Sequence, residues 1–115
     1  MNTYYIKRHD RLPSIAAILK DSAGNVVDLT GYAIRFHMWV DGSTTPKVNA
    51  AAVLVDGAAG SVRYDWAAGD TDTAGDYFCE WEAADPTGRT VTFPNGPDSA
   101  TAAPHDTVVI SEDGA

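Results

Sequence analysis

Apolar and polar residues alternate along several short stretches of this chain, which is the pattern of β-strands that bury one face. The clearest alternation covers residues 32–40. One predicted face of that stretch carries the apolar residues Ile34, Phe36, Met38 and Val40. The opposite face carries Arg35, His37 and Trp39. We therefore predict a strand whose first face packs in a core and whose second face meets solvent or a partner.

The same alternation recurs in residues 76–83. The predicted inner face of this strand carries Tyr77, Cys79, Trp81 and Ala83, and its outer face carries Phe78, Glu80 and Glu82. Shorter patterns predict further strands at residues 4–8, 14–20, 26–29, 47–55, 61–66, 89–93 and 107–111. In the 47–55 stretch a run of three alanines leaves a helical turn as an alternative, because Ala is depleted in strands.

Turn residues separate the predicted strands. Residues 21–25 predict a hairpin turn, and the Asp-Pro-Thr-Gly run at residues 85–88 predicts a tight turn. Residues 4–8 are followed closely by Pro13, and we predict an edge strand there because proline is tolerated at sheet edges and strand ends. Residues 94–104 contain three prolines and small polar side chains, which predict a loop or spacer.

The number and spacing of these stretches predict the fold class. About seven or eight short antiparallel strands with turns between them indicate an all-β fold of the β-sandwich type. The chain has 115 residues, the length of one domain. Of its 16 acidic residues 13 are Asp, which favours turns over helices. We predict a single domain over residues 1–115 that ends in a short strand at residues 107–111.

The charge of the chain bears on its partners. The formal net charge is −8 at pH 7, so a nucleic-acid backbone or an anionic membrane surface would be repelled and neither is predicted as a partner. No apolar run reaches the roughly 18 residues of a membrane helix. The N-terminal residues lack the apolar segment of a signal peptide, so we expect synthesis in the cytoplasm without export.

The most specific motif lies in residues 70–81. Asp72, Ala74 and Tyr77 precede Cys79 in the Asp-x-Ala-x-x-Tyr-x-Cys order that resembles the tyrosine corner of immunoglobulin-like sandwiches. In such a corner the tyrosine hydroxyl bonds to upstream backbone between the two sheets. Cys79 is the only cysteine, so the disulfide of antibody domains is not expected. The motif predicts an immunoglobulin-like structural or binding module without a disulfide.

The acidic residues of this motif also invite a calcium interpretation. Asp70, Asp72 and Asp76 are closely spaced. An EF-hand loop that began at Asp70 would need ligands at the positions of Ala74 and Trp81, and neither side chain supplies one. We therefore prefer capping of turns by the Asp side chains to calcium binding.

Catalytic chemistry has little support in the sequence. His9, His37 and His105 lie far apart, without the close spacing of a zinc site. Cys79 falls on a predicted inner face, and no motif places a histidine beside it. We therefore predict no catalytic residue, no metal and no cofactor, and a protein that is not an enzyme.

The aromatic residues divide into two groups. The residues predicted to pack in the core are Tyr64, Trp66, Tyr77 and Trp81. Trp39 instead shares a polar face with Arg35 and His37, a composition typical of interface anchors, and a packed position under a loop would explain it equally well. Tyr4 and Tyr5 lie on the predicted edge strand. The candidate interface therefore consists of Arg35, His37, Trp39, Tyr4 and Tyr5.

Several motifs together resemble one protein family. They are Lys7-Arg8 ahead of Asp10 and Pro13, the run LKDSAGNVVDLTG from Leu19 to Gly31, RFHM at residues 35–38, and GSVRYDWAAGDTDTAGDY from Gly60 to Tyr77. Over residues up to about 95, the chain resembles the immunoglobulin-like N-terminal domain of phage baseplate upper proteins (the BppU type), which small phage tail and virion proteins also carry. His9 stands where such domains often have Gly, and Cys79 stands where a small residue is common.

The resemblance implies a function as well as a fold. It implies a virion structural protein of the tail, baseplate or neck, present in several copies and bound to other phage virion proteins. The expected location is the virion, after synthesis in the host cytoplasm. A capsid decoration protein is the alternative within the same class. A host-surface module that binds a glycan through Trp39 or the 94–104 loop is the alternative from another class.

Overall fold

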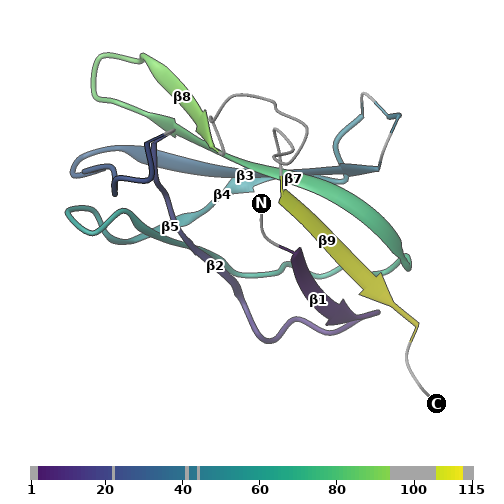
Figure 1. The fold of residues 1–115 in the computed structure, drawn as a ribbon. Coiled ribbons are helices and arrows are strands. Elements are labelled where there is room, and N and C mark those ends of the chain that lie inside the picture. The colour runs from purple at the N-terminus through teal and green to yellow at the C-terminus, as the bar shows by residue number, and fades with distance from the viewer. Residues whose placement is uncertain (1–2, 22, 41, 44, 94–105, 113–115) are drawn as a thin grey trace.

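The computed structural model describes residues 3–21, 23–40, 42–43, 45–93 and 106–112. Within these residues nine strands and no helix are found, and the strands form two sheets that pack against each other (Figure 1). The strands are β1 (Thr3–Lys7), β2 (Ile15–Ile18), β3 (Ala33–Val40), β4 (Val48–Ala51), β5 (Val53–Asp56), β6 (Ser61–Tyr64), β7 (Gly75–Ala84), β8 (Thr90–Phe93) and β9 (Asp106–Ser111). The all-β, sandwich-like architecture predicted from the sequence is confirmed.

The larger sheet is built around β7. It contains six strands, in the order β1-β9-β7-β3-β4, with β8 also paired to β7. One edge of β7 pairs with β3, and the other edge pairs with both β8 and β9. All of these pairs are antiparallel except β1 with β9, which is parallel. The smaller sheet has the order β2-β6-β5. Figure 1 shows β1 in purple beside β9 in yellow at one end of the larger sheet.

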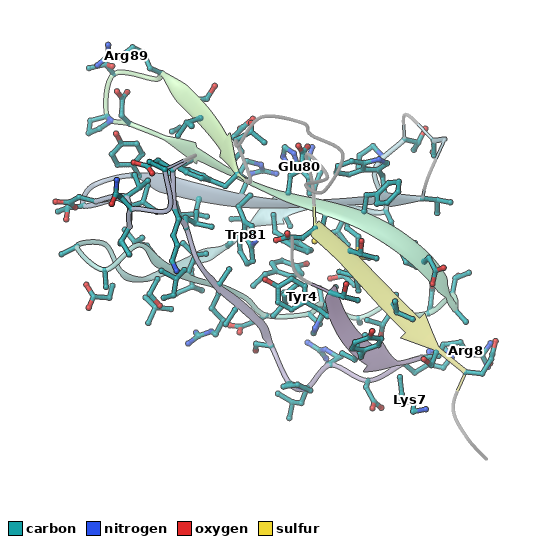
Figure 2. All side chains as sticks on the ribbon, viewed as in Figure 1. Tyr4, Lys7, Arg8, Glu80, Trp81 and Arg89 are labelled. Atoms are coloured by element: carbon teal, nitrogen blue, oxygen red, sulfur yellow. The ribbon has the colours of Figure 1, made fainter. Side chains whose placement is uncertain are left out.

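The core lies between the two sheets and is rich in aromatic rings. Phe36 occupies its centre, with ring centroids 4.8 Å from Tyr64, 5.9 Å from Trp66 and 4.9 Å from Trp81. Figure 2 shows Trp81 between the sheets and Glu80 on the opposite side of β7. The inner faces predicted for β3 and β7 are buried, with the exception of Val40, which is 48% exposed at the end of β3. The alternation along these two strands is therefore confirmed over most of their length.

The stretch predicted as one strand at residues 47–55 forms two strands in different sheets. β4 belongs to the larger sheet and β5 to the smaller one. The chain crosses between them at Ala52, whose N–H donates to the carbonyl oxygen of Ile34 over 2.8 Å. A small side chain at the crossing lets the chain pass from one layer to the other without a bulky group in the way. The prediction of a single strand was wrong, and no helical turn occurs there.

The strand predicted at residues 26–29 is reduced to one isolated bridge between Lys20 and Val26. Val27 N–H also donates to the carbonyl oxygen of Leu19 over 3.1 Å, whereas Leu29 N–H donates to the carbonyl oxygen of Gly57 in the 56–60 turn over 2.8 Å. A Cβ atom at Gly57 would lie 2.8 Å from Thr30 Cα, so only glycine permits this close approach. The predicted hairpin is therefore present but short, and the end of its second arm packs against another loop.

Two further predictions concern the C-terminal part of the chain. The C-terminal strand predicted at residues 107–111 is β9, which begins one residue earlier. The loop or spacer predicted at residues 94–104 lies outside the described residues. In the part of the chain that the structure describes, no helix has the length and apolar character needed to cross a membrane.

Candidate functional site

The outer face of the larger sheet carries a polar row that crosses three strands. Glu80 of β7 lies opposite His37 of β3, and His37 lies opposite Asn49 of β4. Directly opposed residues on neighbouring strands point to the same face. The inner neighbours in these strands, such as Met38 and Cys79, are buried, so the polar row faces away from the core.

An aromatic pair lies beside this polar row. Trp39 of β3 is opposite Phe78 of β7, and their ring centroids are 6.2 Å apart at an interplanar angle of 61°. Both side chains are partly exposed. The contact with Phe78 fixes the position of the Trp39 ring on the outer face, since tilted aromatic pairs at this distance are favourable.

Arg35 borders the polar row on the other side and is engaged by Asn49. Its Nε and Nη2 atoms donate to Asn49 Oδ1 over 3.1 and 3.0 Å, and Nη2 also donates to the Asn49 carbonyl oxygen over 2.9 Å. Because the amide oxygen of Asn49 faces Arg35, its NH₂ group points away from the arginine. The guanidinium therefore acts within the molecule and orients the Asn49 amide.

These residues surround a shallow hollow of about 290 Å³. Its lining residues are His37, Trp39, Ser43, Pro46, Asn49 and Glu80. The hollow lies where the β3–β4 connection approaches the outer face of β3 and β7. It combines an aromatic ring with hydrogen-bonding groups from four separate segments, which is the composition of a small-ligand site.

The five residues of the predicted interface do not form one surface. Arg35, His37 and Trp39 lie together on the outer face of β3, as the alternation indicated. Tyr5 is 73% exposed on the same face of the sheet, but β9 and β7 lie between its strand and β3. Tyr4 points the other way and packs against the core. The two tyrosines of β1 therefore lie on opposite faces of the sheet.

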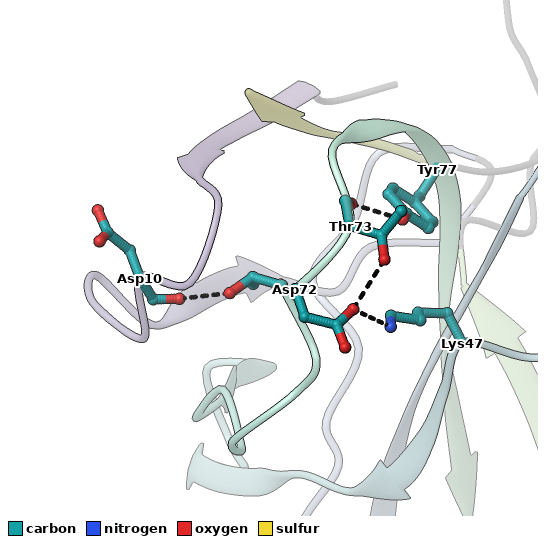
Figure 3. A network of polar contacts seen from close by, with 6 residues as sticks. Asp10, Lys47, Asp72, Thr73 and Tyr77 are labelled. Atoms are coloured by element: carbon teal, nitrogen blue, oxygen red, sulfur yellow. Dashed lines mark hydrogen bonds and ion pairs between the residues drawn. The ribbon is translucent and has the colours of Figure 1, made fainter. Parts of the chain in front are cut away.

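The corner motif forms a polar network ahead of β7. The Tyr77 hydroxyl donates to the Thr73 carbonyl oxygen over 2.7 Å (Figure 3). Asp72 accepts hydrogen bonds from the Lys47 ammonium and, over 2.9 Å, from the Thr73 hydroxyl. These bonds, with the Lys47 bond as the largest influence, lower the pKa of Asp72 from its ordinary value. Ala74 is half-buried and follows Thr73 in the chain.

The same segment contacts the connection between β1 and β2. The Thr71 hydroxyl donates to the Asp10 carbonyl oxygen over 2.8 Å (Figure 3), and the His9 N–H donates to the Thr71 carbonyl oxygen over 2.9 Å. Thr71 is buried. His9 has a φ of 71°, which non-glycine residues rarely adopt. This is the position at which the resemblance to the phage domains leads one to expect Gly.

Two of the acidic residues considered for calcium, Asp70 and Asp72, serve separate contacts. Asp70 accepts hydrogen bonds from the Tyr64 hydroxyl and, over 2.8 Å, from the Ala67 N–H, so it caps the turn that follows β6. Burial, together with Asp70, raises the pKa of Tyr64. Asp72 bonds to Lys47 instead. Over the described ranges, no group of three or more His, Cys, Asp or Glu side chains is placed to hold a metal ion.

Cys79 is fully buried in the core. Burial raises the pKa of its thiol, which disfavours the reactive thiolate. His37 points to the opposite face of the sheet from Cys79, and His9 lies in the β1–β2 connection. His105 falls outside the described residues. The described histidines are therefore not arranged with Cys79 as a nucleophile and base.

The sequence analysis missed Asn49, Phe78, Ser43 and Pro46 as neighbours of Trp39. Phe78 and Glu80 were placed correctly on the outer face of their strand, but the strand that would lie beside β3 was not predicted. The available signal was the shared alternation of the two strongest strands, 32–40 and 76–83, which turn out to pair along eight residues.

No protein-family model matches this chain, and no curated protein matches it. The likeness of its motifs to phage immunoglobulin-like domains is therefore taken up below as a proposal.

Proposed function

We propose that this chain is an immunoglobulin-like assembly module of a phage particle, located in the tail, baseplate or neck and present in several copies. The strand order supports the immunoglobulin-like assignment. In that fold strands B, E and D are neighbours in one sheet, and C, F and G are neighbours in the other. The orders β2-β6-β5 and β3-β7-β9 correspond to these sets, with β4 beside β3 as in variable-type domains.

The position of the corner agrees with this assignment. A tyrosine corner belongs near the start of strand F, and Tyr77 lies near the start of β7, the strand that corresponds to F. The single Cys79 takes the position of the second cysteine of antibody domains, where it packs as a small buried residue. The packed core, with its aromatic rings, stabilises the sandwich in place of a disulfide.

The observation that carries the assembly role is the edge strand β1. This strand is the last in the order of the larger sheet, and Tyr5 at its centre is 73% exposed. An edge strand can pair with a strand of another protein through main-chain hydrogen bonds, and an exposed aromatic side chain adds specificity. A module that docks through this edge acts by binding alone, which is the kind of role that the resemblance to phage virion domains implies.

A point substitution tests this docking better than a truncation. Ile6 of β1 is buried in the core, and Arg8 N–H donates to the Ser111 carbonyl oxygen over 2.7 Å. Deletion of residues 1–8 would therefore disturb the fold itself. Tyr5→Ser leaves these contacts in place and removes only an exposed side chain.

The experiment measures incorporation into phage particles by quantitative mass spectrometry of purified virions. Tyr5→Ser should reduce the copy number per particle, whereas Leu12→Ser should not, although Leu12 is 77% exposed in the β1–β2 connection. Equal incorporation of both variants and the unmodified chain would exclude docking through Tyr5. Absence of the unmodified chain from the particles would contradict the virion role altogether.

A further inference from the structure

The hollow on the outer face has features that the assembly role through β1 does not require. Trp39 contributes a flat apolar surface to its wall, and Phe78 packs against the Trp39 ring from the neighbouring strand. An aromatic ring that is both partly exposed and fixed in position binds flat apolar faces of ligands with a small loss of conformational freedom.

The polar row provides complementary hydrogen-bonding groups at regular spacing. The Asn49 NH₂ group is a donor, since Arg35 engages the amide oxygen. Glu80 supplies acceptor oxygens, and the imidazole of His37 lies between them in the row. Neighbouring strands are about 4.8 Å apart, and β3 lies between the strands of Asn49 and Glu80. The two groups are therefore two strand spacings apart, a distance that a six-membered sugar ring spans when a hydroxyl on each side of the ring makes one hydrogen bond.

The charge of this face selects among ligands. Glu80 lines the hollow and Glu82 lies one position further along the same face of β7. Arg35 is engaged with Asn49 and does not line the hollow. The chain as a whole carries a net charge of −8. An anionic ligand would therefore meet repulsion, whereas a neutral ligand rich in hydroxyl groups would not.

We propose that this hollow binds one neutral pyranose ring of a surface glycan. The apolar face of the sugar packs on Trp39, one hydroxyl accepts a hydrogen bond from the Asn49 NH₂ group, and another donates to Glu80. The volume of about 290 Å³ is at the lower end for small-ligand sites and suits a single ring. Binding by one copy is weak, and several copies on one particle would strengthen attachment through avidity. The site does not depend on the proposed docking through β1.

Saturation-transfer difference NMR on the purified chain tests the proposal with named probes. The methyl glycosides of glucose, galactose and N-acetylglucosamine at millimolar concentration are the neutral probes, and N-acetylneuraminic acid is the anionic one. At least one neutral glycoside should receive saturation, and N-acetylneuraminic acid should not. Absence of transfer to every neutral probe, or transfer to the anionic probe alone, would overturn the proposal.

Variants locate the binding site. Trp39→Ala should weaken binding by about tenfold or more, as expected for loss of a central aromatic contact, and Trp39→Phe should retain part of it. Tyr5→Ala removes another exposed aromatic side chain from the same sheet face and should leave binding unchanged. Binding that Trp39→Ala leaves unchanged would place the sugar elsewhere.

A second variant separates loss of the site from loss of the fold. In Asn49→Asp the Arg35 guanidinium still has an oxygen partner, so the local structure is retained, but the NH₂ donor to the sugar is gone. Asn49→Asp should therefore melt like the unmodified chain in circular dichroism and yet give a reduced NMR response. If Asn49→Asp gives the same NMR response as the unmodified chain, Asn49 does not donate to the sugar and the proposed arrangement is contradicted.

Discussion

The hydroxyl of Tyr77 donates a hydrogen bond to the carbonyl oxygen of Thr73 over 2.7 Å, so β7 fixes the turn from which it emerges. Tyr77 is buried, and the turn is in contact with two further segments. Asp72 binds Lys47 ahead of β4, and Thr71 binds Asp10 in the β1–β2 connection. This one hydroxyl group therefore holds in place a turn that also contacts the residue ahead of β4 and the β1–β2 connection.

Removal of that hydroxyl should destabilise the protein without changing its core volume. Tyr77→Phe loses one hydrogen bond and leaves the Thr73 carbonyl oxygen without this donor, so we expect the free energy of unfolding to fall by about 1 kcal/mol. Urea denaturation followed by circular dichroism measures the change. Tyr5→Phe, at an exposed position, is the matched control and should have almost no effect. If Tyr77→Phe leaves the free energy of unfolding unchanged, the corner hydrogen bond adds nothing to stability.

Acidification should weaken the turn between β7 and β8. The Thr87 hydroxyl and the N–H groups of Thr87 and Arg89 donate to Asp85 and lower its pKa from 3.8 to about 2. A carboxyl group whose pKa is lowered by folding stabilises the native state above its unfolded pKa, and this contribution is lost as pH falls through the folded value. The stability difference between the unmodified chain and Asp85→Asn should therefore shrink between pH 5 and pH 2. A difference that stays constant in urea titrations over this range would contradict the assigned pKa.

His9→Gly should stabilise the protein. His9 has a φ of 71°, a conformation that costs a non-glycine residue roughly 1 kcal/mol or more. Glycine adopts it freely, although its greater freedom in the unfolded chain offsets part of the gain. We expect a small rise in melting temperature by calorimetry. His9→Ala keeps the strained backbone and removes the same imidazole, so it should show no such rise, and equal melting temperatures for the two variants would contradict the argument.

Cys79 should react with thiol reagents only after unfolding. The thiol is fully buried, and burial raises its pKa, so both access and thiolate formation are suppressed. Ellman's reagent should label the native chain slowly and the urea-unfolded chain rapidly. Leu12→Cys adds a thiol at a position that is 77% exposed and should label at once in the native state. Rapid native labelling of the unmodified chain would contradict the burial of Cys79.

The two longest strands could be predicted from the sequence because each buries one complete face. The alternation of Phe36 and Met38 with Arg35 and His37 allows only one orientation toward the core. The division of residues 47–55 between two sheets could not be predicted, because both halves have strand character and the change of layer at Ala52 depends on a bond to Ile34. The alternation of apolar and polar residues within one segment does not indicate which sheet the strand joins.

The candidate site was predictable only in part for the same reason. Arg35, His37 and Trp39 share a strand, so their common face follows from the period of two. Asn49 and Glu80 come from other strands, and their place beside His37 depends on pairing between residues far apart in the chain. Tyr4 and Tyr5 were grouped because both lie on the predicted edge strand, although adjacent residues of a strand point to opposite faces.

The pairing of β8 and β9 with one edge of β7 has a consequence for the diversification of this protein. Phe93 pairs with Trp81, and Asp106 pairs with Cys79, so the segment between Phe93 and Asp106 leaves and rejoins the sheet two positions apart on β7. These two anchor points on β7 are set by strand pairing, and a longer connection between two fixed points adds only a slowly growing entropic cost. The length of chain between Phe93 and Asp106 can therefore vary while the register of β8 and β9 on β7 is kept.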